Sequence, residues 1–193
     1  VNNYSVGHWD AYYGFQLTHT DFFRRGAMRN GHNPDNSYGA GRHHSFTDMM
    51  LKGGLTYKFS GRQLLSANVV YGTMAPLAND AYISPRVCDD TPDNLKSSRI
   101  FSADLNYIFA FNRLKGRVGV FQTNFYDLIE RNSFYYDGVT FVNHMMTGVN
   151  KVHRGIELGL TYKLDGHWSF DLAGTVSEYY YANNPMGTYS IEN

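Results

Sequence analysis

Charge of either sign is scarce in this sequence. Only 18% of the residues are charged, and Lys plus Arg equals Asp plus Glu at 17 each. Average globular chains carry roughly 25% charged residues. A nucleic-acid-binding protein needs a basic surface that neutralises phosphates, and charge-extended disordered segments carry an excess of one sign. The zero formal net charge argues against both classes.

Cysteine, proline and long apolar runs are also scarce. No stretch of about 18 apolar residues is present, so the sequence predicts no transmembrane helix. Nineteen glycines and only five prolines exclude collagen and proline-rich linkers. The one cysteine, Cys88, cannot form an internal disulfide. We interpret Cys88 as a solvent-exposed loop thiol, and the alternative is a pair with a cysteine outside this sequence.

Aromatic residues and strict alternation are what the sequence has in abundance. Tyr, Phe and Trp make up 16% of the chain, and helical periodicity is nearly absent. Apolar and polar residues alternate with the period of two that is typical of β-strands. These runs predict an all-β chain, and they lie at residues 13–20, 53–59, 65–72, 101–109, 118–121, 156–163 and 168–177.

The predicted connections alternate between short and long. Short turns are predicted at residues 60–62, 111–113 and 164–167, the last with the Asp-Gly pair typical of hairpins. Long connections are predicted at residues 24–45, 75–98 and 129–151, and from 182 to the end. Loops longer than about 12–15 residues are uncommon in compact soluble domains. Short turns at one sheet edge and long loops at the other are the layout of an outer-membrane β-barrel.

The polar side of the runs carries mostly Ser, Thr, Asn, Gly and Gln. Its acids, Asp104, Glu157 and Asp171, lie in mid-run. A mid-depth charge on a lipid-facing surface costs up to about 2–4 kcal/mol for Arg or Lys and less for an acid, whereas a lumen imposes no such penalty. We therefore expect these acids to face a lumen and to hydrogen-bond to a plug or to water. Aromatics at the run ends would form an interfacial girdle; they are Tyr57, Phe59, Tyr107, Phe109, Tyr162, Trp168 and Phe170.

The number of predicted strands, seven, does not suit a barrel that closes on itself. Single-chain bacterial barrels use an even number of strands, from about eight upward. The sequence starts at Val1 without a basic or apolar leader and ends in polar residues. We therefore expect residues 1–193 to be a segment of a larger barrel. A soluble all-β module of the carbohydrate-binding type is the alternative, since tyrosine is abundant.

Two stretches are more specific than alternation alone. Residues 81–86 read Ala-Tyr-Ile-Ser-Pro-Arg, and residues 148–158 read Gly-Val-Asn-Lys-Val-His-Arg-Gly-Ile-Glu-Leu. Together with the loop entry at residues 22–31 and the strand at residues 51–59, they make nearly the whole chain resemble the barrel of TonB-dependent outer-membrane receptors of the Bacteroidetes type. The resemblance implies a segment of an antiparallel transmembrane β-barrel of about 22 strands with a plugged lumen.

The same resemblance implies a function and a set of partners. It implies active uptake of a bulky, scarce solute, such as a siderophore, cobalamin or a glycan, across the outer membrane of a Gram-negative bacterium. The implied partners are the remainder of the barrel, a plug domain, the TonB complex and lipopolysaccharide. No plug domain, TonB box or C-terminal barrel signal is recognisable in residues 1–193. A passive porin segment is the further alternative, which a plug encoded in the same gene would exclude.

The predicted long loops hold the candidate site residues expected in extracellular loops, which are Arg24, Arg25, His43, His44, Tyr82 and Arg86. The Arg24–Arg25 pair suits bidentate binding of lipopolysaccharide phosphates, and a snorkelling pair at the interface is the equal alternative. The tyrosines at residues 179–181 are interpreted as an upper girdle rather than as a stacking platform for a ligand.

No metal, cofactor or catalytic site is expected. His32, His43 and His44 lie near Asp35 but lack a second group with ligand spacing, which favours a solvated loop over a metal site. The acids Asp89, Asp90 and Asp93 lack the fixed Gly and Glu positions of a calcium loop, which favours a solvated turn. No Ser/His/Asp set, phosphate-binding loop or paired carboxylates stand out, so we expect no enzyme activity.

Overall fold

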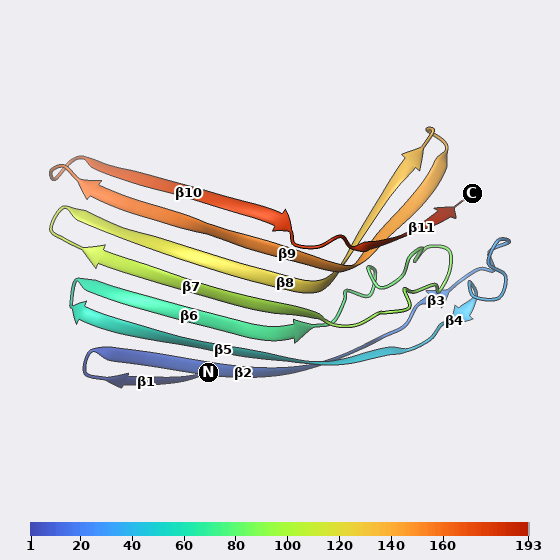
Figure 1. The fold of residues 1–193 in the computed structure, drawn as a ribbon, viewed down its shortest axis with the longest axis horizontal. Helices are drawn as coiled ribbons and strands as arrows, with labels where there is room; N and C mark the ends of the chain where they lie inside the picture. The colour runs from blue at the N-terminus through green and yellow to red at the C-terminus, as the bar shows by residue number, and fades with distance from the viewer. Residues whose placement is uncertain (193) are drawn as a thin grey trace.

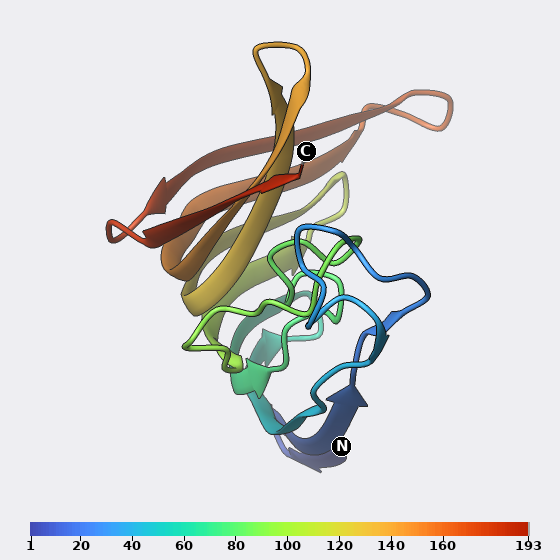
Figure 2. The same ribbon diagram turned by 90° about the vertical axis from the view of Figure 1, so that its right-hand side faces the viewer.

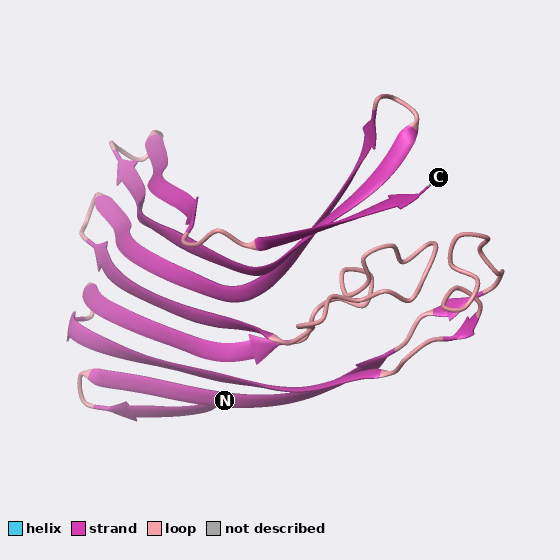
Figure 3. Cartoon of the chain, turned by 45° about the vertical axis from the view of Figure 1, so that its right-hand side comes forward, coloured by secondary structure: helices cyan, strands magenta, loops and turns pink. Residues whose placement is uncertain are grey.

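The computed structural model describes residues 1–192 and builds them from strands, turns and loops (Figure 3). No helix among these residues is long and apolar enough to cross a membrane. The strands are β1 (Asn2–Val6), β2 (Trp9–Phe22), β3 (Arg25–Gly26), β4 (Gly39–Ala40), β5 (His44–Ser60), β6 (Gln63–Met74), β7 (Ser98–Ala110), β8 (Leu114–Tyr136), β9 (Thr140–Lys163), β10 (Ser169–Tyr181) and β11 (Met186–Glu192).

One antiparallel nine-stranded sheet dominates the fold. Its order is β1-β2-β5-β6-β7-β8-β9-β10, with β11 paired to the outer half of β9, while β3 and β4 form a separate small ladder. The seven alternating runs correspond to β2, β5, β6, β7, β8, β9 and β10, which confirms them as strands. The sheet is open, because β1 at one end and β10 at the other do not pair with each other.

Several sequence-based expectations about strand ends are wrong. The connection predicted at residues 129–151 is instead strand, because β8 and β9 continue as a paired hairpin to a turn at residues 137–139. The end of the chain, expected to be loop, forms β11, and β1 was not predicted. Asp127 and Gly148 adopt positive φ angles of 59° and 67°, and the β8–β9 register shifts between Phe125 and Glu130. These bulges bend the outer part of the hairpin away from the sheet (Figure 1).

The predicted separation of turns and loops is confirmed. The tight turns after β5, β7 and β9 lie together at one edge, and the connections at residues 23–43 and 75–97 lie at the other (Figure 1). The β8–β9 hairpin tip also lies at this second edge. We call the two edges the short-turn edge and the long-loop edge.

The strand register places apolar residues together on one face, the apolar face. One row crosses seven strands and contains no polar residue; it consists of Ala11, Leu55, Ala67, Leu105, Val120, Ile156 and Val176. Its large side chains are 42–79% exposed. A sandwich of two sheets would bury such a row, so nothing in residues 1–192 supplies the apolar partner that this face requires.

The opposite face, the polar face, carries the alternate residues. The row beside the apolar one consists of Asp10, Thr56, Ser66, Asn106, Gly119, Glu157 and Thr175. Phe121 also lies on this face, over Gly155. The alternating run at residues 118–121 therefore places apolar side chains on both faces of the sheet. The sheet curves, and the connections at residues 23–43 and 75–97 lie within its concave side (Figure 2).

The aromatic residues beside the short turns form a belt on the apolar face. Trp9 packs on Tyr57 with ring centroids 4.6 Å apart, and Tyr57 meets Phe59 at 5.0 Å. Tyr107, Phe109 and Phe111 continue the series at 5.7 and 5.6 Å. Such belts mark the level where hydrocarbon meets the polar interface.

The face assignment predicts different environments for neighbouring residues of β9. In the parent receptor, Cys substituted for Leu158 is expected to react with a lipid-soluble maleimide, and Cys substituted for Glu157 with a water-soluble one only. The reason is that a period of two sends successive side chains to opposite faces. Labelling in isolated outer membranes measures this, with Cys88→Ser as background. Equal labelling at both positions would show that the register is wrong.

Candidate functional site

The largest fully buried side chains lie near the long-loop edge and not in the middle of the sheet. They come from the connections at residues 23–43 and 75–97 and from the outer part of the β8–β9 hairpin, which together we call the loop cluster. The buried members are Ser37, Ala81, Tyr82, Ser84, Cys88, Val142, Asn143, Met145 and Val149. The cluster has its own packed core, so its shape is determined by residues of this chain.

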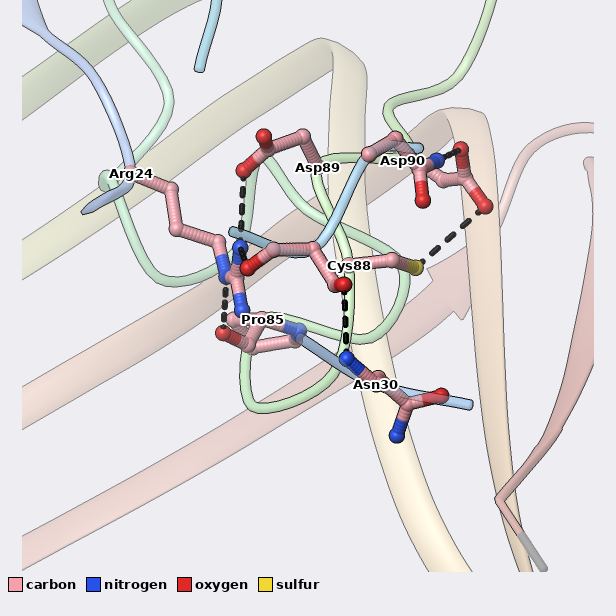
Figure 4. Close-up of polar contacts among 8 residues, drawn as sticks. Arg24, Asn30, Pro85, Cys88, Asp89 and Asp90 are labelled. Carbon is pink, nitrogen blue, oxygen red and sulfur yellow. Dashed lines mark hydrogen bonds and ion pairs between the residues drawn. The ribbon is translucent and has the colours of Figure 1, made fainter. Parts of the chain in front are cut away.

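Arg24 joins the first two connections of the cluster (Figure 4). Its Nε donates to the Pro85 carbonyl at 2.6 Å, and Nη1 donates to the Ser37 carbonyl at 3.2 Å and to Asp89 Oδ1 at 2.9 Å. The side chains of Arg24 and Asp89 are only 12% and 16% exposed. Neither lipopolysaccharide binding nor snorkelling therefore describes Arg24, and Asp89 is not in a solvated turn. Arg25, by contrast, is exposed in β3.

Cys88 is buried, and the expectation of an exposed thiol is wrong. It is 2% exposed, and its Sγ donates to Asp90 Oδ2 at 3.3 Å. Asp90 also accepts from Asn36 Nδ2 at 2.6 Å, which ties the two connections together a second time. Burial is the main cause that raises the pKa of the Cys88 thiol. The thiol therefore stays protonated and has a structural role.

The burial of Cys88 predicts a thiol that does not react in the folded protein. In the folded parent receptor, Cys88 is expected not to react with a water-soluble maleimide at pH 7, because the nucleophile is the thiolate and the sulfur is enclosed. Mass spectrometry before and after denaturation measures the modification. Rapid modification of the native receptor would contradict the described packing of residues 75–97.

The connection at residues 75–97 also contacts the β8–β9 hairpin and β11. Asn143 Nδ2 donates to Ser84 Oγ at 3.1 Å, and Ser84 Oγ donates to Ser190 Oγ at 2.8 Å. The guanidinium of Arg86 lies 4.8 Å from the centre of the Phe141 ring. The cluster is therefore a three-way junction with residues 75–97 at its centre.

The histidines of the first connection make aromatic and acid contacts. His43 stacks on Phe23 with centroids 4.4 Å apart and lies 3.1 Å from Asp21 Oδ1. His44 meets the edge of Tyr82 at 5.8 Å. Tyr82 is 3% exposed, and burial raises the pKa of its phenol. Within residues 1–192, no three His, Cys, Asp or Glu side chains are grouped to hold a metal ion.

The polar face carries a chain of polar contacts that runs from β2 over β5 to β9 and uses side chains of five of these six strands. Tyr12 donates to Asn68 Oδ1 at 3.0 Å, and Asn68 donates to Asp104 Oδ1 at 2.8 Å. Asn106 also donates to Asp104 and accepts from Arg117 Nε at 2.8 Å. The chain ends at Glu157, whose Oε2 lies 3.2 Å from Arg117 Nη2. Gly119 leaves the space that the Asn106 amide occupies.

Asp104, Glu157 and Asp171 are thus on one face, as their spacing predicts. Asp171 accepts a hydrogen bond from Thr161 Oγ1 at 2.6 Å. The sequence patterns indicate acids that hydrogen-bond to a plug or to water, whereas in the structure these acids bond to residues of their own wall. Among residues 179–181, Tyr181 donates to Glu130 Oε2 at 2.8 Å and Tyr180 lies beneath Arg154.

Sequence reasoning missed Asp48, which the structure buries on the polar face at the outer end of β5. Asp48 is 4% exposed and lies opposite Thr18 of β2. The alternating run was placed at residues 53–59, because the sequence His-Ser-Phe-Thr-Asp-Met-Met before it does not alternate cleanly. An acid directly before two methionines, Met49 and Met50, was the signal that could have drawn attention to this position.

These features define a class of protein. A curved antiparallel sheet with one polar face, one uncovered apolar face, an aromatic belt and long loops at one edge is the wall of an outer-membrane β-barrel. The family model described as TonB dependent receptor-like, beta-barrel, matches residues 1–192.

The chain therefore belongs to the TonB-dependent receptor β-barrel family. This family consists of outer-membrane transporters of Gram-negative bacteria and not of enzymes. Its full proteins contain a plug domain and interact with TonB. Neither the curated proteins nor the solved structures compared with the chain give a match.

Proposed function

We propose that residues 1–193 form part of the wall and of the outer mouth of a single barrel domain that takes up a bulky, scarce solute. The observation that carries the proposal is the contrast between the two faces: a continuous polar network on the concave side and an uncovered apolar row on the other. A water-filled or plugged lumen accounts for the first face, and lipid accounts for the second.

The open edges of the sheet support the remaining part of the proposal. Unpaired N–H and C=O groups cost several kcal/mol each in hydrocarbon, and only closure removes them. Further strands of the parent receptor therefore pair with β1 and β10 in the proposed assembly, and a plug domain fills the lumen. Asp104, Glu157 and Asp171 face that lumen, while Arg25, His43 and Arg86 are solute-contacting candidates at the extracellular mouth. Tyr82 and Arg24 support this mouth from inside the loop cluster. It stays a prediction that the receptor is of the Bacteroidetes type and that it contacts lipopolysaccharide.

Growth of a strain that lacks the parent gene tests the function. The strain is grown with a ferric siderophore, cobalamin or an oligosaccharide as the limiting nutrient, with and without the gene restored, and in the presence and absence of TonB. We expect the gene to improve growth on one nutrient at low concentration only when TonB is present. Improvement that is independent of TonB would indicate a passive porin, and no improvement on any nutrient would contradict the uptake proposal.

A further inference from the structure

A cavity of about 420 Å³ lies on the polar face beneath the start of the connection at residues 75–97. β2 contributes alternate residues from its outer half, β5 contributes Asp48 and Met50, and the connection contributes residues 75–78. The cavity is thus built from this chain alone, on the concave side of the wall and close to the long-loop edge. A solute that enters the mouth of the barrel meets this level of the wall early.

Asp48 is the unusual member of the cavity lining. Both of its carboxylate oxygens are buried, and within residues 1–192 neither has a hydrogen-bond partner. Buried polar groups in folded proteins are hydrogen-bonded in the large majority of cases, and an unpaired buried carboxylate is among the most costly exceptions. The acids of the loop cluster and of the polar network described above have partners, whereas Asp48 is a buried acid on the wall whose interaction is left to another molecule.

No positively charged side chain among residues 1–192 pairs with the Asp48 carboxylate. The residues that line the cavity include no Lys, Arg or His. Lys52 lies further along the same face of β5, but its side chain extends over Gly14 of β2. Thr18 lies directly opposite Asp48, and Gln16 donates to the Thr18 hydroxyl at 3.2 Å. The immediate surroundings of the carboxylate are therefore neutral.

The remainder of the lining is largely apolar. Phe22, Met50, Met74, Pro76 and Leu77 surround the cavity together with the hydroxyls of Thr18 and Thr20. Ligand cavities of roughly 300–1,000 Å³ with apolar walls and a few placed polar groups suit small organic molecules. One buried carboxylate in such a setting selects for a positive charge, because a neutral ligand would leave the carboxylate unpaired.

We propose that this cavity is a subsite for an organic cation, in which a primary ammonium or guanidinium group pairs with Asp48 and an apolar body packs against Met50, Phe22 and Leu77. The proposal rests on the proposed uptake function and names a chemical class for part of the solute. Asp48 lines this cavity and its carboxylate has no hydrogen-bond partner among residues 1–192, so a cationic group bound there would supply the missing interaction.

Binding of benzylammonium and of benzyl alcohol to the purified full-length receptor in detergent tests the subsite. The two probes share an aromatic body and differ in the positive charge. Isothermal titration is expected to give a Kd for benzylammonium at least tenfold lower than that for benzyl alcohol. In Asp48→Asn the preference is expected to vanish, through a tenfold or greater rise in the Kd for benzylammonium alone. Asp21→Asn is the matched control, because Asp21 lies on the same hairpin but is exposed beside His43.

Melting temperatures separate the solute from a plug side chain as the partner of Asp48. If no plug cation pairs with Asp48, Asp48→Asn removes an unpaired buried charge, and the apo receptor is expected to melt at a higher temperature. A lower melting temperature together with no benzylammonium binding to the unmodified receptor would assign the carboxylate to the plug and overturn the proposal. Equal binding of both probes to the unmodified receptor would also overturn it.

A second variant keeps the test decisive if Asp48→Asn does not fold. Thr18→Val suits a strand and removes the hydroxyl that lines the cavity opposite Asp48, where its oxygen is expected to accept a second hydrogen bond from the bound ammonium. A threefold or greater weakening of benzylammonium binding with benzyl alcohol unchanged supports the subsite, and unchanged binding of both probes contradicts it. Growth assays with the same variants distinguish the two proposals. TonB-dependent growth without a preference for benzylammonium would contradict the subsite proposal alone. A preference for benzylammonium without TonB-dependent growth would contradict the uptake proposal alone.

Discussion

The substitution Ile156→Arg is expected to reduce assembly of the parent receptor in the outer membrane several-fold. Ile156 is 54% exposed in the middle of the apolar row, between Val120 and Val176. A lipid-facing arginine at mid-depth costs about 2–4 kcal/mol, which is a large share of the 5–15 kcal/mol that typically stabilises a folded protein. The amount of folded receptor in outer-membrane fractions, read from its heat-dependent mobility in gels, is expected to fall several-fold.

Thr175→Arg is the matched control for Ile156→Arg. Thr175 lies at nearly the same depth but on the polar face, directly opposite Glu157. An arginine there meets the carboxylate of Glu157 on the polar face, so assembly is expected at the normal level. Normal assembly of Ile156→Arg, or equal failure of both variants, would contradict the assignment of the two faces.

Replacement of Arg24 by leucine is expected to open the loop cluster. The Asp89 side chain, which is only 16% exposed, loses its positively charged partner. The carbonyls of Pro85 and Ser37 lose the donor that Arg24 supplies. Removing one partner of a buried ion pair costs about 3–5 kcal/mol. Hydrogen exchange in residues 75–97 of the purified receptor is expected to accelerate by at least tenfold, while exchange in the sheet stays unchanged.

Two further variants isolate the cause. Arg25→Leu removes a neighbouring arginine that is exposed, and it is expected to leave hydrogen exchange unchanged. Arg24→Leu combined with Asp89→Leu removes the uncompensated charge, so part of the protection is expected to return. Unchanged protection in Arg24→Leu alone would show that the ion pair does not hold the connections together.

The wall of the barrel was predictable from sequence because its two faces meet different surroundings. Between the belt of aromatics and the long-loop edge, every second residue of β5, β7 and β9 faces lipid, and selection for apolar side chains there produces the alternation that marks the strands. The same logic placed Asp104, Glu157 and Asp171 on one face. The short turns follow from the ends of these runs.

The outer part of the fold was not predictable by the same logic. The hairpin between residues 129 and 151 lies beyond the region where one face meets lipid, so both of its faces tolerate polar side chains and the alternation disappears. β11 pairs with this outer part of β9 and lacks clear alternation for the same reason, whereas β1 is a strand of only five residues beside the short-turn edge. Strand structure there depends on backbone pairing, which leaves little trace in composition.

The candidate site was predictable only in its location. The long-loop edge and several of its residues follow from the spacing of runs, but their roles depend on contacts between residues far apart in sequence. Arg24 and Asp89 are separated by 65 positions, and nothing local distinguishes Arg24, which is buried, from Arg25, which is exposed. The burial of Cys88 and of Asp48 likewise results from the way residues 75–97 fold over the wall.

The solution behaviour of residues 1–193 expressed alone tests the central claim that this sheet is part of a larger barrel. An open sheet exposes its apolar row and its unpaired edges to water, which favours aggregation. Size-exclusion chromatography and thermal melting in buffer without detergent are therefore expected to show insoluble material or an oligomer. A soluble monomer with a sharp, cooperative melting transition would contradict the claim.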